Sequence, residues 1–261
     1  MLLRFHILLQ QNTSGSHALE DCAGRHGGEL VDANEDALST MTFARRTEAE
    51  KRGEIYLRLD ESGALFWVID GVGGAALGGQ AARLVDAGLQ RGAASAGHLR
   101  LGEALAALNE AVCALGVDAD GRSLGACAAT VARFDDAGGV LLGHSGDTVG
   151  YQYHRASGRL RRLTASGDGS KVIRDYLGQG PGVAAQVVTV AAQVGDLILL
   201  CSDGVSKGMR DSAIETALSR RCADVVVDLR RAAAEIATAA RKGGSDDDIS
   251  IVLVEVVGQD P

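Results

Sequence analysis

Residues 65–74 read LFWVIDGVGG, and this stretch decides how we expect the chain to fold. Its first five residues are apolar and have the length of a buried strand, and the run stops on an acid, Asp70. Three of the next four residues are glycine, which lets the backbone bend sharply beside the carboxylate. An acid at the end of a buried strand, followed by such a turn, is typical of an oxygen ligand aimed at a cation.

Acidic residues recur beside other apolar runs. Residues 197–204 read LILLCSDG, a second strand-like run that ends on Asp203 and a glycine. Glu35 and Asp36 lie in NEDAL, and residues 245–248 read SDDD immediately before the apolar run ISIVLVEVV. Carboxylates repel one another in a low dielectric, so their convergence requires a cation. A set of oxygen ligands favours Mg²⁺ or Mn²⁺ over zinc.

The composition limits the class of protein. A chain of 261 residues that is 46% hydrophobic can bury a large core, and with only two prolines we expect a single domain over residues 1–261. The net charge of -8 argues against a nucleic-acid binder. Five cysteines without a CxxC pair indicate a reducing cytoplasm rather than a disulfide framework. No run reaches the roughly 18 apolar residues that a membrane span needs, so we expect no membrane partner.

Hydrophobic periodicity predicts strands, two helices, strands, two helices and a last strand. Residues 1–10 predict a strand, and the runs on either side of the turn DESG (residues 60–63) predict a β-hairpin. The charge run at residues 44–54 predicts a solvated loop or a short helix. Helical spacing occurs in four segments, which are residues 75–92, 99–117, 211–220 and 223–241.

Residues 126–164 predict a meander of antiparallel strands between the two pairs of helices. Because strands and helices do not alternate regularly, we expect an α+β fold in which helices cover antiparallel sheets. Arg159, Arg161 and Arg162 form a basic edge of this meander. That edge is either a solvated face or a docking site for an acidic phosphoprotein.

Six motifs in register over nearly the whole chain resemble the metal-dependent serine/threonine phosphatases of the protein phosphatase 2C (PPM) type, in their bacterial form. They are NEDA, FWVIDGVGG, LLGHSGDTVGYQY, LRRLTASGDGS, GDLILLCSDGV and DDDISIVLV. The resemblance implies a four-layer α-β-β-α sandwich of two mainly antiparallel sheets flanked by helices. It also implies a signalling hydrolase of the cytoplasm. Its substrate would be a phosphoserine or phosphothreonine protein paired with a kinase, and the phosphate would be removed by a water that bridges two Mg²⁺ or Mn²⁺ ions.

The resemblance further implies roles for individual residues. Asp70 would bridge the two ions, and Asp70 and Asp36 would be the catalytic pair. Gly71 would bind through its carbonyl, and Glu35 through a water. The implied metal ligands are Asp36, Asp70, Gly71, Asp203, Asp247 and, for a third and weaker ion, Asp147. The substrate-binding residues stay unidentified.

The sequence departs from the family pattern around this site. Val31 stands where some members carry an arginine that binds the substrate phosphate, which leaves Arg25, Arg45 and Arg46 as candidates to replace it. Val72 stands where eukaryotic members have a histidine that is proposed as a general acid. Bacterial members commonly lack that histidine too.

Residues 165–178 are all that remains of a flap subdomain that family members place beside the active site, and Asp248 replaces their usual asparagine. The missing flap and arginine leave an alternative function open, a weak or inactive relative that binds a partner protein through the same fold.

Two other motifs indicate different functions, but each has an argument against it. GVGGAA after Asp70 matches a dinucleotide fingerprint, but the acid would lie beside the pyrophosphate. Cys127 and Arg133 have cysteine-phosphatase spacing, but no glycine lies between them.

Overall fold

The computed structural model describes residues 1–10, 37–42, 47–51, 54–59, 63–72, 77–94, 100–164, 175–183, 185–222 and 227–258, with the backbone alone for 37–55 and 93–94 among these. The strands are β1 (Leu2–Gln10), β2 (Ala37–Thr42), β3 (Thr47–Lys51), β4 (Glu54–Arg58), β5 (Ala64–Gly71), β6 (Cys127–Phe134), β7 (Gly139–Ser145), β8 (Val149–His154), β9 (Arg159–Arg162), β10 (Gln186–Ala191), β11 (Leu197–Cys201) and β12 (Ile249–Gly258). The helices are α1 (Gly78–Ala94), α2 (Leu101–Cys113), α3 (Asp203–Gly208), α4 (Asp211–Cys222) and α5 (Leu229–Lys242).

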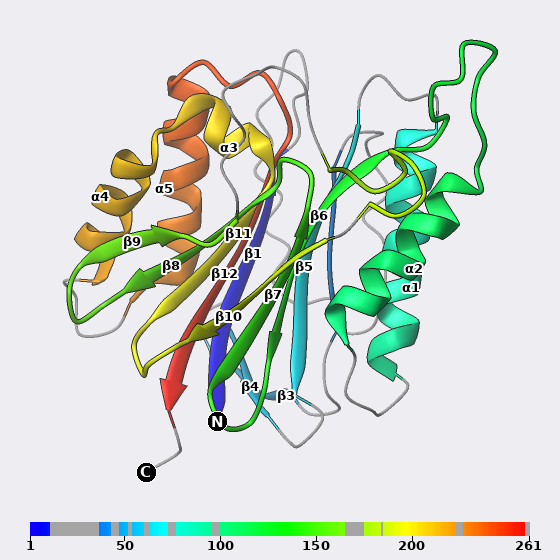
Figure 1. Ribbon diagram of the computed structural model, residues 1–261. Helices are drawn as coiled ribbons and strands as arrows, with labels where there is room; N and C mark the ends of the chain where they lie inside the picture. Colours follow the sequence, from blue (N-terminus) through cyan, green and yellow to red (C-terminus); the bar gives the residue numbers. More distant parts are fainter. Residues whose placement is uncertain are drawn as a thin grey trace.

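Two antiparallel sheets lie face to face between two layers of helices (Figure 1). The larger sheet has the order β3-β4-β1-β12-β11-β8-β9, and the smaller has the order β10-β7-β6-β5-β2. Helices α1 and α2 cover the outer face of the smaller sheet, and α3, α4 and α5 cover that of the larger sheet (Figure 1). The predicted four-layer α+β sandwich is therefore confirmed.

The alternation of side chains along β5 shows how the layers are built. Leu65, Trp67 and Ile69 pack against α1 and α2, whereas Phe66 and Val68 lie in the core between the two sheets. Because both faces of β5 are buried, its sequence is apolar from Ala64 to Ile69 instead of alternating. By the same two-residue period, Asp70 continues the face of Phe66 and Val68. Its carboxylate therefore belongs to the end of the space between the sheets.

Aromatic contacts join the two sheets across this inner core. The ring of Phe66 meets Phe5 of the larger sheet edge to face, with centroids 5.2 Å apart. On its own sheet it meets Phe134 in the same manner, at 5.4 Å. On the other face of β5, the indole nitrogen of Trp67 donates to Asp86 Oδ1 of α1 at 3.0 Å. Strand β5 is thus held from both sides, which is what a rigid support for Asp70 requires.

The predicted hairpin around DESG is wrong. Strand β4 pairs with β1 and β3, while β5 pairs with β2 and β6, so the chain changes sheet between them. A turn sequence shows that the chain reverses direction but does not show which strand becomes the neighbour. Strand β5 is buried on both faces, and a place inside the smaller sheet buries both faces better than a place beside β4 would.

The predicted meander is interrupted for a similar reason. Strands β6 and β7 pair in the smaller sheet, and β8 and β9 pair in the larger one. The chain crosses between them at Gly146, which has a φ of 96°. A Cβ at this glycine would also lie 2.4 Å from Ala128 Cβ. The crossing turn therefore requires glycine, and the next residue is Asp147.

Other predicted boundaries also change. Residues 47–51 form strand β3 where we expected a loop or a short helix. Helix α5 begins at Leu229, later than residue 223, because the Asp228 side chain caps it by accepting from Arg231 N at 2.9 Å. The six-residue helix α3 was not predicted, since it is too short to show helical periodicity. None of the described helices has the length and hydropathy needed to span a bilayer.

Candidate active site

Four predicted acids come together where strands of both sheets end. Asp70 lies at the end of β5, Asp147 in the crossing from β7 to β8, Asp203 at the start of α3 after β11, and Asp247 just before β12. Burial raises the pKa of Asp70 well above its usual value, and the charges of Asp203, Asp147 and Asp247 raise it further. The structure therefore gathers these acids, as the sequence predicts.

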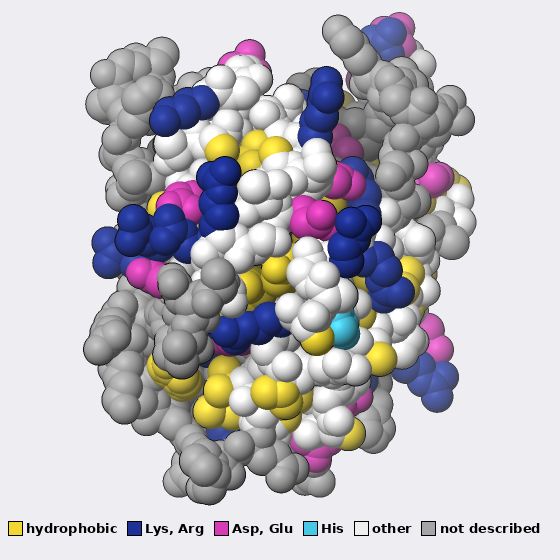
Figure 2. Space-filling model, turned by 90° about the vertical axis from the view of Figure 1, so that its left-hand side faces the viewer, with side chains coloured by type: hydrophobic (Ala, Val, Ile, Leu, Met, Phe, Trp, Pro, Cys, Tyr) yellow, Lys and Arg dark blue, Asp and Glu magenta, His cyan; other side chains and the backbone are white. Residues whose placement is uncertain are grey.

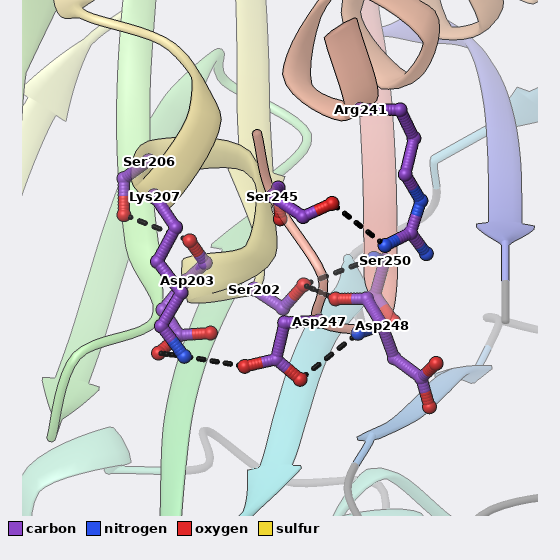
Figure 3. Close-up of polar contacts among 9 residues, drawn as sticks. All are labelled: Ser202, Asp203, Ser206, Lys207, Arg241, Ser245, Asp247, Asp248 and Ser250. Atoms are coloured by element: carbon purple, nitrogen blue, oxygen red, sulfur yellow. Dashed lines mark hydrogen bonds and ion pairs between the residues drawn. The ribbon is translucent and has the colours of Figure 1, made fainter. Parts of the chain in front are cut away.

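Backbone packing brings Asp203 and Asp247 to one place (Figure 3). The Ser202 hydroxyl donates to the Asp248 carbonyl at 3.1 Å and accepts from Ser250 N at 3.0 Å, which joins the end of β11 to the start of β12. A Cβ at Gly204 would lie only 2.2 Å from that same carbonyl. The glycine of the SDG motif is thus the residue that allows the two acidic turns to touch.

Asp248 supports the neighbouring Asp247 through its backbone. Its backbone N–H donates to Asp247 Oδ1 at 2.9 Å, and its own side chain is buried. This hydrogen bond orients the Asp247 carboxylate and leaves its second oxygen directed at α3 (Figure 3).

Lys207 places its ammonium between two of the clustered carboxylates (Figure 3). It lies one helical turn after Asp203 on α3, and its Nζ is 2.7 Å from Asp203 Oδ2. The same nitrogen donates to Asp247 Oδ2. Burial alone would lower the pKa of Lys207, but the hydrogen bonds to Asp203 and Asp247 outweigh it and hold the pKa above its usual value. Sequence reasoning missed this residue, and its spacing of four from Asp203 was the available signal.

The chemistry of the cluster fits a divalent cation such as Mg²⁺ or Mn²⁺. The clustered acids offer only oxygen atoms to an ion, and Asp203 Oδ1 is buried without a hydrogen-bond partner. Burial raises the pKa of Asp203 to about 6, and the charge of Asp147 adds to this, although the hydrogen bond from Lys207 opposes it. Within the part of the chain that the structure describes, no three His, Cys, Asp or Glu side chains are arranged to hold an ion as they stand.

Several predicted residues lie outside the described part of the chain. They are Glu35, Asp36, Val31, Arg25, Arg45, Arg46 and most of the shortened flap, which covers residues 165–178. Gly71 is described and ends β5 opposite Cys127. The roles of all these residues, and of the four clustered acids, stay predictions.

Cys127 does not have the properties of a nucleophile. The residue is fully buried on β6, and burial, followed by the charge of Asp70, raises the pKa of its thiol well above the usual value. A thiol that stays protonated neither attacks phosphorus nor binds metal readily. The cysteine-phosphatase spacing of Cys127 and Arg133 is therefore accounted for by a buried strand.

A buried polar network supports the turn that carries Asp147. Thr130 Oγ1 on β6 lies 3.0 Å from His144 Nδ1 on β7 and 2.8 Å from the hydroxyl of Thr148, which follows Asp147. All three side chains in this network are buried. Burial, followed by the positive charge of Arg162, lowers the pKa of His144 to about 4, so the imidazole is neutral at pH 7.

The basic edge predicted from the sequence lies on the face shown in Figure 2, to which β9, α4 and α5 contribute. Its arginines are interleaved with acids. Arg159 lies 3.8 Å from Glu215, and Arg162 lies 3.8 Å from Asp211. Arg161 donates to a side-chain oxygen of β8 at 3.3 Å. Much of the positive charge is thus compensated within the molecule.

Comparison with known families agrees with this geometry. The family model described as Stage II sporulation protein E (SpoIIE) matches residues 70–257, which is more than half of the chain. The chain belongs to the SpoIIE family. The matched segment starts at Asp70 and includes Asp147, Asp203 and Asp247. The SpoIIE match covers most of the segment that holds the sequence motifs resembling the PPM-type serine/threonine phosphatases. A search of curated protein sequences finds no match.

Solved structures share the fold of this SpoIIE-family chain. The catalytic domain of the phosphatase PstP, crystallised with two manganese ions, is 21% identical with a TM-score of 0.65, and the match covers 99% of this chain and 100% of that one. PppA of Pseudomonas aeruginosa is 21% identical with a TM-score of 0.65 and 97% coverage of both chains. Stp1 of Staphylococcus aureus is 16% identical with a TM-score of 0.66, covering 90% of this chain and 99% of Stp1.

Proposed function

We propose that the protein hydrolyses phosphoserine or phosphothreonine on a protein substrate with the help of two Mg²⁺ or Mn²⁺ ions. The observation that carries this proposal is the convergence of Asp70, Asp147, Asp203 and Asp247 at the ends of strands from both sheets. The orphaned Asp203 Oδ1 and the all-oxygen donor set support it. The two manganese ions of the PstP catalytic domain, which has the same fold, support it as well.

The proposed ligands would divide the work as follows. Asp70 would lie between the two ions, and Asp203, Asp247, Asp36 and the Gly71 carbonyl would complete their coordination, with Glu35 acting through water and Asp147 holding a third ion. When bound, the ions supply Lewis acidity, which activates a water and neutralises phosphoryl oxygens. The protein's own contribution is to hold the proposed ligands in place. Strand β5 fixes Asp70 between the sheets, and Gly204 keeps the turns of Asp203 and Asp247 in contact.

Hydrolysis of an aryl phosphate tests the proposal directly. Purified protein with Mn²⁺ should turn over the substrate, and EDTA should stop the reaction. Asp70→Asn keeps the size of the side chain but removes the charge that would bridge the ions, so we expect a loss of at least about 100-fold in kcat/KM. Asp120→Asn is the matched control, because that carboxylate is 74% exposed in a surface loop. It should leave the activity unchanged.

The alternative, a weak or inactive phosphatase-like scaffold, is favoured by the Lys207 ammonium, which holds two of the proposed ligands. The same assay separates the two functions. If Mn²⁺ binds but neither an aryl phosphate nor phosphothreonine peptides are hydrolysed, the scaffold function is supported and the hydrolase is rejected. The single-domain organisation, the kinase-paired phosphoprotein partner and the cytoplasmic location belong to the hydrolase proposal and stay predictions.

A further inference from the structure

The ammonium of Lys207 and a metal ion would need the same oxygens. Lys207 Nζ lies 2.7 Å from Asp203 Oδ2 and also donates to Asp247 Oδ2, although these two acids are 44 positions apart in the sequence. Both acids belong to the proposed ligand set. A divalent ion held by these carboxylates would lie within a few ångströms of the ammonium, and two positive charges at that distance repel strongly in a partly buried site.

The ammonium of Lys207 can move out of the site into solvent. Its side chain is 48% exposed, whereas those of Asp203 and Asp247 are 14% and 30% exposed. Lysine carries its charge on four flexible methylene groups, so the ammonium can move into solvent while the backbone of α3 stays in place. The backbone has little freedom of its own, because a Cβ on Gly208 would lie 2.0 Å from the carbonyl of Ala240 in α5. Movement of the side chain alone is therefore the route by which an ion gains these oxygens.

We propose that Lys207 is an internal competitor for the metal, a cation that holds Asp203 and Asp247 together and must leave before an ion binds both. This inference rests on the proposed function for the identity of the ligands. Lys207 thereby sets the concentration of Mn²⁺ at which the site fills. It also limits the repulsion between the two carboxylates while they hold the ammonium.

Removing the charge of Lys207 should have opposite effects on Mn²⁺ binding and on the stability of the metal-free protein. Lys207→Met keeps an unbranched side chain that is one atom shorter and has no ammonium, so Mn²⁺ no longer has to displace a cation, and we expect its Kd to fall about tenfold or more. In EDTA, the same variant should melt at a lower temperature than the wild type, because Asp203 and Asp247 lose the charge between them. A single substitution that tightens metal binding and weakens the metal-free fold is not the result expected of a side chain that merely packs.

Calorimetric titration of Mn²⁺ into EDTA-stripped, dialysed protein measures the first effect, and thermal unfolding followed by circular dichroism measures the second. Lys242→Met is the matched control, since it makes the same change on an exposed lysine in the last turn of α5. Its Kd should stay within about twofold of the wild type. Lys207→Arg retains a cation and should not tighten binding.

The outcomes separate this inference from the proposed function. Equal or weaker Mn²⁺ binding by Lys207→Met, in a variant that still unfolds cooperatively, overturns the role of Lys207 and leaves the phosphatase proposal standing. Failure of both the wild type and Lys207→Met to bind Mn²⁺ rejects the metal site itself, and the inference falls with it. Tighter binding by Lys207→Met but not by Lys242→Met supports the internal competitor.

Discussion

His144 is a buried histidine that the fold keeps neutral. It is 5% exposed, and its Nδ1 lies 3.0 Å from Thr130 Oγ1. Burial, followed by the charge of Arg162, lowers its pKa from 6.5 to about 4. The unfolded chain therefore binds more protons than the folded protein between these two pH values. The stability that the neutral imidazole contributes is fully present above pH 6.5 and is lost as the pH falls toward 4.

Replacing this histidine should flatten the acid side of the stability profile. We expect the wild type to lose about 3 kcal/mol of unfolding free energy through His144 between pH 6.5 and 4, and His144→Gln to lose correspondingly less. Urea unfolding at several pH values in EDTA measures the slope. His154→Gln changes a half-buried histidine at the end of β8 and should keep the wild-type slope. Identical slopes for His144→Gln and the wild type would contradict the assignment.

Single acids could be predicted at this site because each ends or begins an apolar run. Asp70 lies at the end of β5, Asp203 follows β11, and Asp247 precedes β12, so strand periodicity alone brings them to strand ends. Lys207 could not be found in this way. Its role depends on the short helix α3 and on a turn that lies far away in the sequence. Its spacing of four from Asp203 indicates a contact with that acid, but no sequence pattern indicates the contact with Asp247.

Among the elements, the turn from β11 into α3 tolerates no side chain at Gly204. A Cβ there would lie 2.2 Å from the Asp248 carbonyl and 3.2 Å from Ile249 Cγ1, so Gly204→Ala forces α3 away from the start of β12. We expect a loss of about 1–3 kcal/mol in unfolding free energy. Mn²⁺ binding should weaken as well, because the turns of Asp203 and Asp247 separate.

Thermal unfolding and Mn²⁺ titration measure these two losses. Gly180→Ala is the control, since a Cβ at Gly180 would have no heavy atom within 4 Å. It should change neither quantity appreciably. A Gly204→Ala protein as stable as the wild type would show that the two turns can move apart without cost.

The elements also show where sequence reasoning stops. Strand positions could be predicted from apolar runs, but the partners of β4 and β5, and of β7 and β8, could not. Strand pairing is decided by which faces must be buried in the assembled core, whereas a turn sequence such as DESG carries only local information. Crossing turns were therefore mistaken for hairpins, including the one that carries Asp147.

At the scale of the whole molecule, a buried ion pair ties the first strand to the last. Arg4 on β1 lies directly opposite Glu255 on β12 and donates through Nε to Glu255 Oε2 at 2.8 Å. Both side chains are almost fully buried, and Arg155 Nη1 lies 3.5 Å from the other carboxylate oxygen. Strand β1 precedes residues 70–257, so this pair joins the family-matched part of the chain to the part before it.

Removing one member of this ion pair should lower the unfolding free energy strongly, whereas removing both members should lower it much less. Arg4→Met leaves Glu255 buried with less compensation, and we expect a loss of about 3–5 kcal/mol in unfolding free energy. Arg4→Met combined with Glu255→Leu should recover most of that loss. Urea unfolding followed by the fluorescence of Trp67, the single tryptophan of the sequence, measures all three proteins. A double variant as unstable as Arg4→Met would contradict this account.

The layered architecture could be predicted from the sequence, since the order of strands and helices and the motif resemblance both indicate a sandwich. The order of the strands within each sheet could not, because it is fixed by contacts between distant segments. Pairs such as Leu9 with Ser250 have no local sequence signal at all.

The place of β12 has a consequence for the order in which the molecule can be assembled. It follows every other described strand in the sequence, yet it lies inside its sheet, between β1 and β11. A ribosome therefore delivers this inner strand after the other described strands, and pairings of such long sequence separation close slowly. Asp247 enters with that strand. A chain still being synthesised therefore lacks Asp247 beside Asp203 until this strand has joined the sheet.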